Sequence, residues 1–243
     1  MVSFDSTSAG KEFSMEFILD PVAVRVLGAL VEKEVTTPDY YPLSLNALVN
    51  ACNQKSNREP VMQLSEEEVS AALDTLREKR LVWQRSVAGA RVHKFEHNIR
   101  SFFPFSEQEL CALCVLMLRG PQTVGEIKIR SERLCTFSSL DAAEQVVRSL
   151  TAEERGGPFI TELPRLPGKK EPRFIHLFCG MEWTEQFAAA GAVESPVGSD
   201  GSATPVRGSI TERIVNLETT VAQLQDELQS LREEFTAFKR ELE

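Results

Sequence analysis

Two sets of polar side chains in this sequence have the chemistry that nucleic-acid recognition needs. The first set lies in segment 53–58, Asn-Gln-Lys-Ser-Asn-Arg, and the second is a group of later cations. Amide and guanidinium groups can pair with base edges in a DNA groove, and lysine binds phosphate as a point charge. The candidates for DNA binding are Asn53, Gln54, Lys55, Asn57, Arg58, Lys128, Arg130, Arg133, Arg165, Lys169, Lys170 and Arg173.

Both sets also have a structural interpretation. The amides and Arg58 could cap helices and fix the backbone of their own loop. The later cations could form a solvated hairpin, or a docking surface between two parts of the molecule. In addition, Glu66, Glu67 and Glu68 open the helix after segment 53–58, and carboxylates there would repel phosphate. Both interpretations stay open, and the later set is the more permissive for DNA.

The sequence contains no recognisable catalytic or metal-binding motif. The patterns of serine hydrolases, dinucleotide-binding enzymes, P-loop NTPases and zinc peptidases are all missing. Cys111 and Cys114 have metal-like spacing, but they lie in an apolar helical run without a second such pair. His93 and His97 stand in a predicted strand with no nearby cysteine or second carboxylate to complete a site. We therefore expect no enzymatic activity, no metal and no cofactor.

The elements that must position these side chains follow one order that occurs twice. In the first copy, Asp20 and Pro21 begin a helix, and a second helix spans 44–52. A capping box at 65–68 begins a third helix. Strands at 81–85 and 91–95 then flank a turn at 87–90.

The second copy repeats this order from residue 106. A capping box begins an apolar helix that ends at Gly120, Thr123 caps a short helix, and Ser138 opens a third. Strands follow at 159–163 and 173–178. Three helices and a two-stranded hairpin are typical of a winged helix. The sequence therefore predicts a mainly α fold with small β hairpins (α+β), built from two tandem winged-helix domains.

The last 34 residues carry a heptad pattern, because apolar residues recur at alternating intervals of four and three. Oppositely charged g and e residues, such as Arg213 and Glu218, favour a parallel dimer. The alternatives are a trimer, a solvated amphipathic helix, or a helix folded back on its own domain. The predicted oligomerisation residues are Ile210, Ile214, Leu217, Val221, Leu224, Leu228, Leu231, Phe235, Phe238 and Leu242.

These patterns divide the chain into five segments. We expect a disordered tail at 1–16, winged-helix domains at 17–100 and 101–187, a flexible linker at 188–209, and a coiled coil at 210–243.

Composition limits the partners and the compartment. The 243 residues carry a net charge of -9, but residues 184–243 alone contribute -6, so the body is close to neutral and can still hold a local basic patch. The longest apolar run has nine residues, far fewer than the roughly 20 that span a membrane. No secretory signal pattern is present, so we expect a cytoplasmic protein without a membrane partner.

Four separated motifs resemble the bacterial YceH family. The match covers about residues 17–180, and Lys128, Ile129 and Leu166 depart mildly from the motifs. The resemblance implies a tandem winged-helix fold and a cytoplasmic location, and it brings no established activity. The motifs are Thr37-Pro-Asp-Tyr-Tyr-Pro-Leu-Ser-Leu-Asn-Ala-Leu48, Cys52-Asn-Gln-Lys-Ser-Asn-Arg-Glu-Pro-Val61, Gly125-Glu-Ile-Lys-Ile-Arg-Ser-Glu-Arg-Leu134 and Glu162-Leu-Pro-Arg-Leu-Pro-Gly-Lys-Lys-Glu171.

Two functions fit these features. The leading hypothesis is a dimeric protein that binds double-stranded DNA, for instance as a transcriptional regulator, with the coiled coil joining two tandem heads. The alternative is a protein–protein interaction adaptor of the kind found in chromosome-segregation complexes, which rests on fold analogy. The basic second hairpin favours DNA, whereas the acidic helix start and acidic tail favour another protein as the partner.

Overall fold

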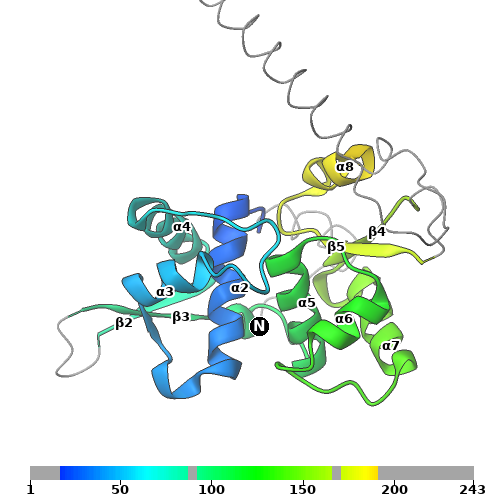
Figure 1. Ribbon diagram of the computed structural model, residues 1–243, viewed down its shortest axis with the longest axis horizontal. Helices are drawn as coiled ribbons and strands as arrows, with labels where there is room; N and C mark the ends of the chain where they lie inside the picture. The colour runs from blue at the N-terminus through cyan, green and yellow to red at the C-terminus, as the bar shows by residue number, and fades with distance from the viewer. Residues whose placement is uncertain (1–16, 87–91, 166–170, 191–243) are drawn as a thin grey trace, which may run out of the picture. The chain divides into compact units, whose positions relative to one another are not determined.

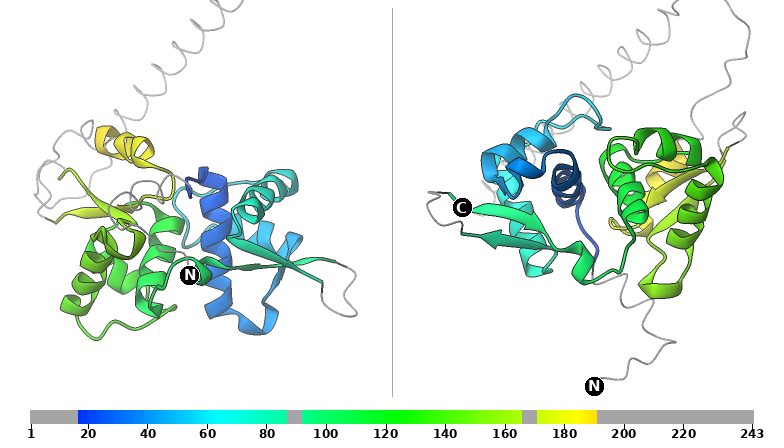
Figure 2. Two further views of the ribbon diagram at one scale, coloured as in Figure 1. Left: turned by 180° about the vertical axis from the view of Figure 1, so that it is seen from behind. Right: turned by 90° about the horizontal axis from the view of Figure 1, so that it is seen from below.

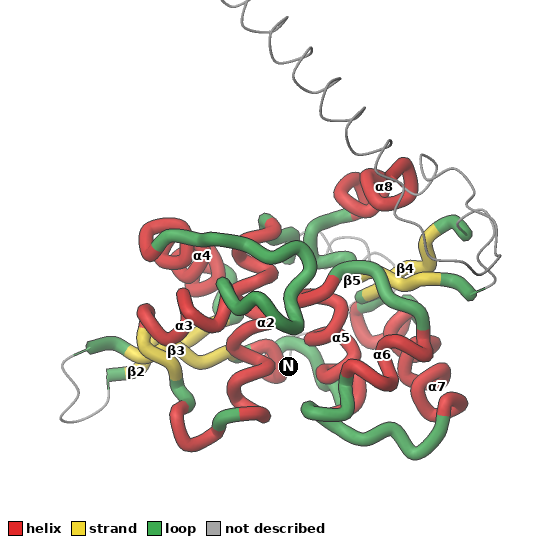
Figure 3. Tube along the Cα trace, in the orientation of Figure 1, coloured by secondary structure: helices red, strands yellow, loops and turns green. Residues whose placement is uncertain are grey.

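The computed structural model describes residues 17–86, 92–165 and 171–190, and these residues have an α+β fold (Figure 1). They contain seven α-helices and two small antiparallel sheets, drawn as red and yellow tube in Figure 3. The α+β class predicted from the sequence is confirmed. Residues 17–100 are called the first half below, and residues from 101 onward the second half.

The helices of the first half begin where their capping residues predict. Asp20 accepts hydrogen bonds from the amides of Val22 and Ala23, at 2.8 and 2.9 Å. Ser65 and Glu68 form a reciprocal capping box, and the backbone amide of each binds the other's side chain. These helices are α2 (Pro21–Thr36), α3 (Leu45–Cys52) and α4 (Glu66–Glu78).

A three-stranded antiparallel sheet with the order β1–β3–β2 completes the first half. Gln84 pairs with Phe95, and Val82 with His97. The second hairpin strand lies at 94–97, and the predicted span of 91–95 is wrong. Its alternate residues Phe95 and His97 are both buried, as expected for one face of a strand. No sequence pattern indicated the two-residue β1. The elements are η1 (Pro38–Tyr40), β1 (Leu43–Ser44), β2 (Val82–Arg85), β3 (Lys94–His97) and η2 (Ile99–Ser101).

The second half repeats three helices and a hairpin. Capping boxes begin α5 and α6, and Gly120 ends α5 with φ +68°, a conformation that favours glycine. Its two strands pair antiparallel, with Ile160 opposite His176. The elements are α5 (Glu107–Arg119), α6 (Val124–Arg130), α7 (Leu140–Thr151), η3 (Glu154–Gly156), β4 (Ile160–Leu163), β5 (Arg173–His176) and α8 (Met181–Ala190).

Helices α2 and α5 join the halves. They lie side by side in Figures 1 and 2, and both are buried nearly all round, as expected of central helices. Gly28 allows the close approach, because a Cβ there would lie 3.0 Å from Leu118 Cδ2 and 3.1 Å from Met117 Cβ. The Cys114 thiol also donates to the Gly28 carbonyl at 3.5 Å. One hydrophobic core therefore runs through both halves.

Helix α8 was not predicted. It continues to Ala190, so the linker predicted from residue 188 cannot begin before 191. Its helical segment 181–190 combines Trp183 and Phe187 with alanines, too short a pattern to stand out in the sequence. The tail at 1–16, the rest of the linker and the heptad residues lie outside the described residues.

Candidate functional site

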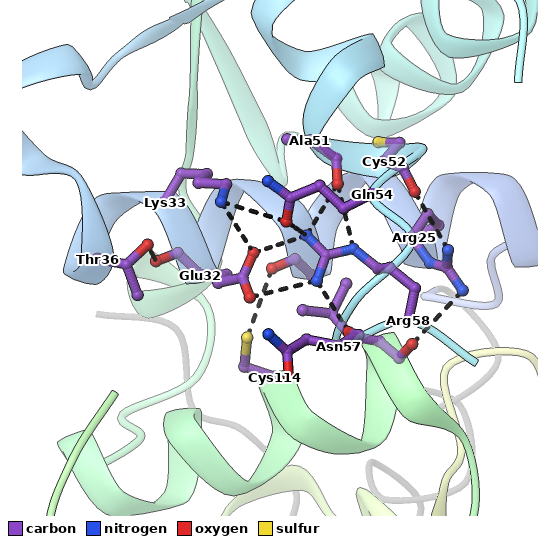
Figure 4. A network of polar contacts seen from close by, with 12 residues as sticks. Arg25, Glu32, Lys33, Thr36, Ala51, Cys52, Gln54, Asn57, Arg58 and Cys114 are labelled. Carbon is purple, nitrogen blue, oxygen red and sulfur yellow. Dashed lines mark hydrogen bonds and ion pairs between the residues drawn. The ribbon is translucent and has the colours of Figure 1, made fainter. Parts of the chain in front are cut away.

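A buried ion pair between Glu32 and Arg58 is the centre of a polar network where the two halves meet (Figure 4). Glu32 lies on α2 and Arg58 lies in the loop after α3. Two guanidinium nitrogens reach the two carboxylate oxygens, at 3.2 Å for Nη1 and 2.6 Å for Nη2. The side chain of Arg58 is fully buried and that of Glu32 is 3% exposed. We call this group and the cations around it the seam cluster.

Arg58 also closes the end of α3. Its Nε and Nη2 donate to the Ala51 carbonyl at 3.1 and 2.8 Å, one of the carbonyls that a helix end leaves without a partner. The same guanidinium donates to Gln54 Oε1 at 3.1 Å and to the Asn57 carbonyl at 2.9 Å. Each nitrogen of the Arg58 guanidinium therefore has an internal acceptor, and this residue cannot contact DNA in this conformation.

Asn53 has a similar local role. Its Nδ2 donates to the Leu64 carbonyl at 2.8 Å, and its Oδ1 accepts from the Leu64 amide at 2.7 Å. The side chain thus mimics a strand pairing across the loop. For Asn53 and Arg58 the structure supports the structural interpretation over the DNA-binding one.

Three arginines of the second half surround this centre. Arg133 donates to Glu32 Oε1 at 3.2 Å, and Arg119 donates to Asn57 Oδ1. Arg130 donates to Gln122 and forms an ion pair with Glu126 at 3.0 Å. Two sequence-predicted motifs, one from each half, therefore meet in space.

The electrostatics reflect this crowding of cations. Burial alone would raise the pKa of Glu32, but the hydrogen bonds and charge of Arg58, with Lys33 beside it, hold that pKa below its ordinary value. Burial, followed by the positive charges of Arg130 and Arg133, lowers the pKa of Arg119. The charges of Arg130 and Arg133 therefore add to burial in disfavouring the charged form of Arg119.

The cluster has an enclosed centre and an accessible rim. Arg58 and Glu32 are buried, whereas the Arg133 side chain is 59% exposed. Five cations surround three carboxylates in this group, so its cations outnumber its carboxylates. The cations are Lys33, Arg58, Arg119, Arg130 and Arg133, and the carboxylates are Glu32, Glu59 and Glu126.

The remaining predicted cations belong to the second half. Lys128 is half-buried on α6, Arg165 is exposed after β4, and Arg173 is half-buried on β5. Lys169 and Lys170 lie outside the described residues. The structure therefore does not bring the hairpin cations into the seam cluster through any contact among the described residues.

A separate groove of about 690 Å³ lies between α6, α7, the β4–β5 hairpin and α8. Its lining is mostly apolar, and Leu140 and Met181 on its wall are about half exposed. Glu144 on α7 pairs with Arg148 at 3.3 Å across the same helix surface. Such a concave apolar surface is typical of a binding site.

The cysteines and histidines do not form a metal site within the described residues. Cys111 and Cys114 are buried free thiols on α5. His97 is buried and pairs with Glu34 at 2.9 Å, while His93 is exposed. In the part of the chain that the structure describes, no helix has both the length and the apolar content to cross a bilayer.

Sequence reasoning missed Glu32, Lys33 and Arg119. One signal was present, because Arg25 and Glu32 lie seven residues apart with only apolar residues and Gly28 between them. Two helical turns put both side chains on one face, so two charges had to be buried together there. Their partners could not be found, because those partners come from distant parts of the chain.

Comparisons with known proteins give the family. The profile described as "Protein of unknown function, DUF480" matches residues 19–169. A UPF0502 protein of Azoarcus is 46% identical over 98% of this chain and 100% of its own length. A relative from Vibrio parahaemolyticus is 46% identical over 90% of this chain and 96% of its own length. Another, from Citrifermentans bemidjiense, is 52% identical over 77% of this chain and 85% of its own length. The chain therefore belongs to the YceH family, the UPF0502 proteins, whose function is uncharacterised.

Proposed function

We propose that this chain is a non-enzymatic tandem winged-helix protein that binds double-stranded DNA. In each half, three helices precede an antiparallel hairpin, which is the element order of the winged helix. The isolated bridge between Gln122 and Phe174 occupies in the second half the place that β1 takes in the first. This parallel supports the interpretation of the two halves as copies of one motif.

The observation that carries the proposal is the seam cluster. Segments 53–58 and 128–133 each carry side chains suited to DNA, and both contribute to one cluster with a cationic excess. Arg133 is exposed at its rim, and Lys55 is an exposed residue of segment 53–58. Phosphate contacts of this kind supply most of the non-specific affinity for DNA and position the protein on the duplex.

In this proposal the recognition helix, which contacts the DNA bases, belongs to the second half. Helix α7 follows Ser138 and Ser139, which are uncharged, and Arg133 lies in the turn just before them. A winged helix places the start of its third helix in the major groove and its turn at the backbone. The first half is unsuited to this mode, because Glu66, Glu67 and Glu68 are all exposed. DNA contact is therefore assigned to α7, with the seam cluster beside it.

The proposal includes a homodimer. The unbroken heptads of segment 210–243 support a parallel coiled coil that joins two copies of the tandem body. Two duplex-contacting surfaces in one particle would bind two half-sites, as expected of a regulator of transcription.

A salt titration of binding to random duplex DNA tests the proposal. Binding should be measurable at low salt, and the Lys55→Gln, Arg133→Gln double variant should bind at least tenfold more weakly. Its slope of log affinity against log salt should fall by about 2, one for each phosphate that the variant no longer neutralises. An Arg77→Gln, Arg100→Gln variant is the matched control, because both arginines are exposed and lie outside the seam cluster. Absence of binding by the intact protein at low salt would exclude the DNA function.

One observation favours a second function, that of a protein–protein interaction adaptor. The groove between α7 and the β4–β5 hairpin has apolar walls at the surface that a DNA-reading winged helix would keep polar. Its half-exposed Leu140 and Met181 suit an apolar segment of another protein. A photo-crosslinker at Leu140 would trap such a partner, and a Met181→Glu variant should then weaken binding of the purified partner while leaving any DNA affinity unchanged.

A further inference from the structure

Arg25 is a buried cation that has no acidic partner among the described residues. It lies on α2 and is 2% exposed. Its terminal nitrogens donate to the carbonyls of Cys52, Pro60 and Leu118, at 3.2, 2.8 and 3.5 Å. Figure 4 shows the bond to Cys52. These acceptors are neutral, so they satisfy hydrogen bonds without balancing the charge. A buried charge without a counter-charge is costly, and proteins normally pair it.

The nearby charges make the imbalance larger. Arg58 is close enough for its charge to lower the pKa of Arg25, in addition to the effect of burial. Arg58 itself has Glu32 as its partner. Glu59 also lines the cavity beside Arg25, but this residue is exposed and forms no ion pair with Arg25 within the described ranges.

A small cavity beside Arg25 contains a second unsatisfied polar group. Arg25 and His176 both line it, and Arg25 Nε and His176 Nδ1 are buried atoms without a hydrogen-bond partner among the described residues. His176 is 1% exposed on β5, and burial lowers its pKa to about 3, so its imidazole is neutral at pH 7. A neutral imidazole can still donate one hydrogen bond from Nδ1.

Helix α8 forms one wall of this cavity. The Trp183 ring stacks on His176 with centroids 5.1 Å apart, and Phe187 packs against Trp183 at 4.7 Å. The cavity volume is about 30 Å³, which is enough for one water-sized occupant and too small for phosphate. Met62 and Met117 contribute apolar walls, and a charge interaction is stronger beside such walls than in bulk water.

We propose that this cavity is a binding site for a small monovalent anion of about the size of chloride. Arg25 supplies the counter-charge and its Nε–H, and His176 supplies a neutral Nδ1–H. Because the site lies between α2, the loop after α3 and α8, the anion ties the last helix of the second half to the first half. The anion thereby removes the charge imbalance at Arg25.

Anomalous diffraction from crystals of the full chain grown in sodium bromide tests the site directly. The expected result is a bromide peak within contact distance of both Arg25 Nε and His176 Nδ1. A well-ordered water at that position, with no anomalous signal at saturating bromide, would overturn the proposal.

Thermal unfolding provides the test in solution. At constant ionic strength, replacing gluconate by chloride should raise the unfolding midpoint, and above the dissociation constant the rise should follow the logarithm of the chloride concentration. A His176→Phe variant keeps a ring for Trp183 to stack on but lacks the donor, and the chloride concentration at which the rise begins should be at least tenfold higher. The same substitution at the exposed His93 is the control and should change nothing. Equal chloride dependence of the wild type and His176→Phe would refute the site.

Discussion

Replacing Arg58 by methionine should destabilise the protein more than any exposed charge substitution. Methionine keeps much of the buried volume but removes both hydrogen bonds to Glu32 and both hydrogen bonds to the Ala51 carbonyl. Glu32 then stays buried with only Lys33, at 3.4 Å, and the exposed Arg133 as partners within the described part of the chain. The variant therefore still buries the Glu32 carboxylate, but it lacks the Arg58 charge and hydrogen bonds that offset the cost of that burial.

The size of the effect follows from the burial of both groups. Breaking a buried ion pair by removing one partner costs about 3–5 kcal/mol, because a charge is left uncompensated. Lys33 and Arg133 still contact Glu32, so we expect a loss near the lower end, about 3 kcal/mol. For a domain of this size, each kcal/mol lowers the melting temperature by roughly 2–4 °C, so the midpoint should fall by roughly 6–12 °C.

The loss should also depend on pH. Arg58 holds the folded-state pKa of Glu32 below its ordinary value of 4.5, so the pair contributes its full stability above pH 4.5 and loses it as the pH falls through the lowered pKa. In the Arg58→Met variant burial prevails and that pKa rises. The difference in unfolding free energy between wild type and variant should thus be largest at pH 7 and shrink as the pH falls through the raised pKa of Glu32 in the variant.

Urea unfolding followed by circular dichroism at pH 7 and pH 4 measures both effects. Arg77→Met is the control, because its ion pair with Asp74 is exposed and should be worth under about 1 kcal/mol. In an Arg58→Met, Glu32→Met double variant the penalty should partly disappear, since no charge remains buried at this pair. A loss below about 1 kcal/mol for Arg58→Met, or one that does not change with pH, would refute the role given to this pair.

Two further predictions concern other parts of the chain. Removing residues 209–243 should convert a dimer into a monomer with an unchanged circular dichroism signature for the body, and an unchanged mass in light scattering would contradict the heptad interpretation. Burial would raise the pKa of Glu109, but hydrogen bonds from Arg155, Ser149 and Ser106 lower that pKa to about 2. The ionised Glu109 therefore stabilises the fold above its ordinary pKa of 4.5, and this stability is lost as the pH falls toward 2. An Arg155→Ala variant should therefore unfold at a higher pH in an acid titration, while an identical titration curve would show that the contact contributes nothing.

The sequence alone determined where several helices of this protein begin and where α5 ends. Asp20, Ser65, Ser106 and Thr123 each precede a helix, and each accepts a hydrogen bond from an amide two or three residues later. Such caps involve only neighbours in the chain, so composition and spacing are enough to find them. Gly120 ends α5 for an equally local reason, because glycine adopts its positive φ without strain.

The tertiary structure decided which charges meet and which remain available. Glu32 contacts Arg58 across 26 residues and Arg133 across 101, and nothing in local spacing predicts either contact. The packing of α3 on α2 brings Arg58 to Glu32, and the packing of α5 on α2 joins the half that carries Arg133. In the resulting fold Arg58 is enclosed while Lys55, three residues earlier, faces solvent. A residue's type fixes what its side chain can bind, but burial and partners fix whether it can, and these depend on contacts between distant segments.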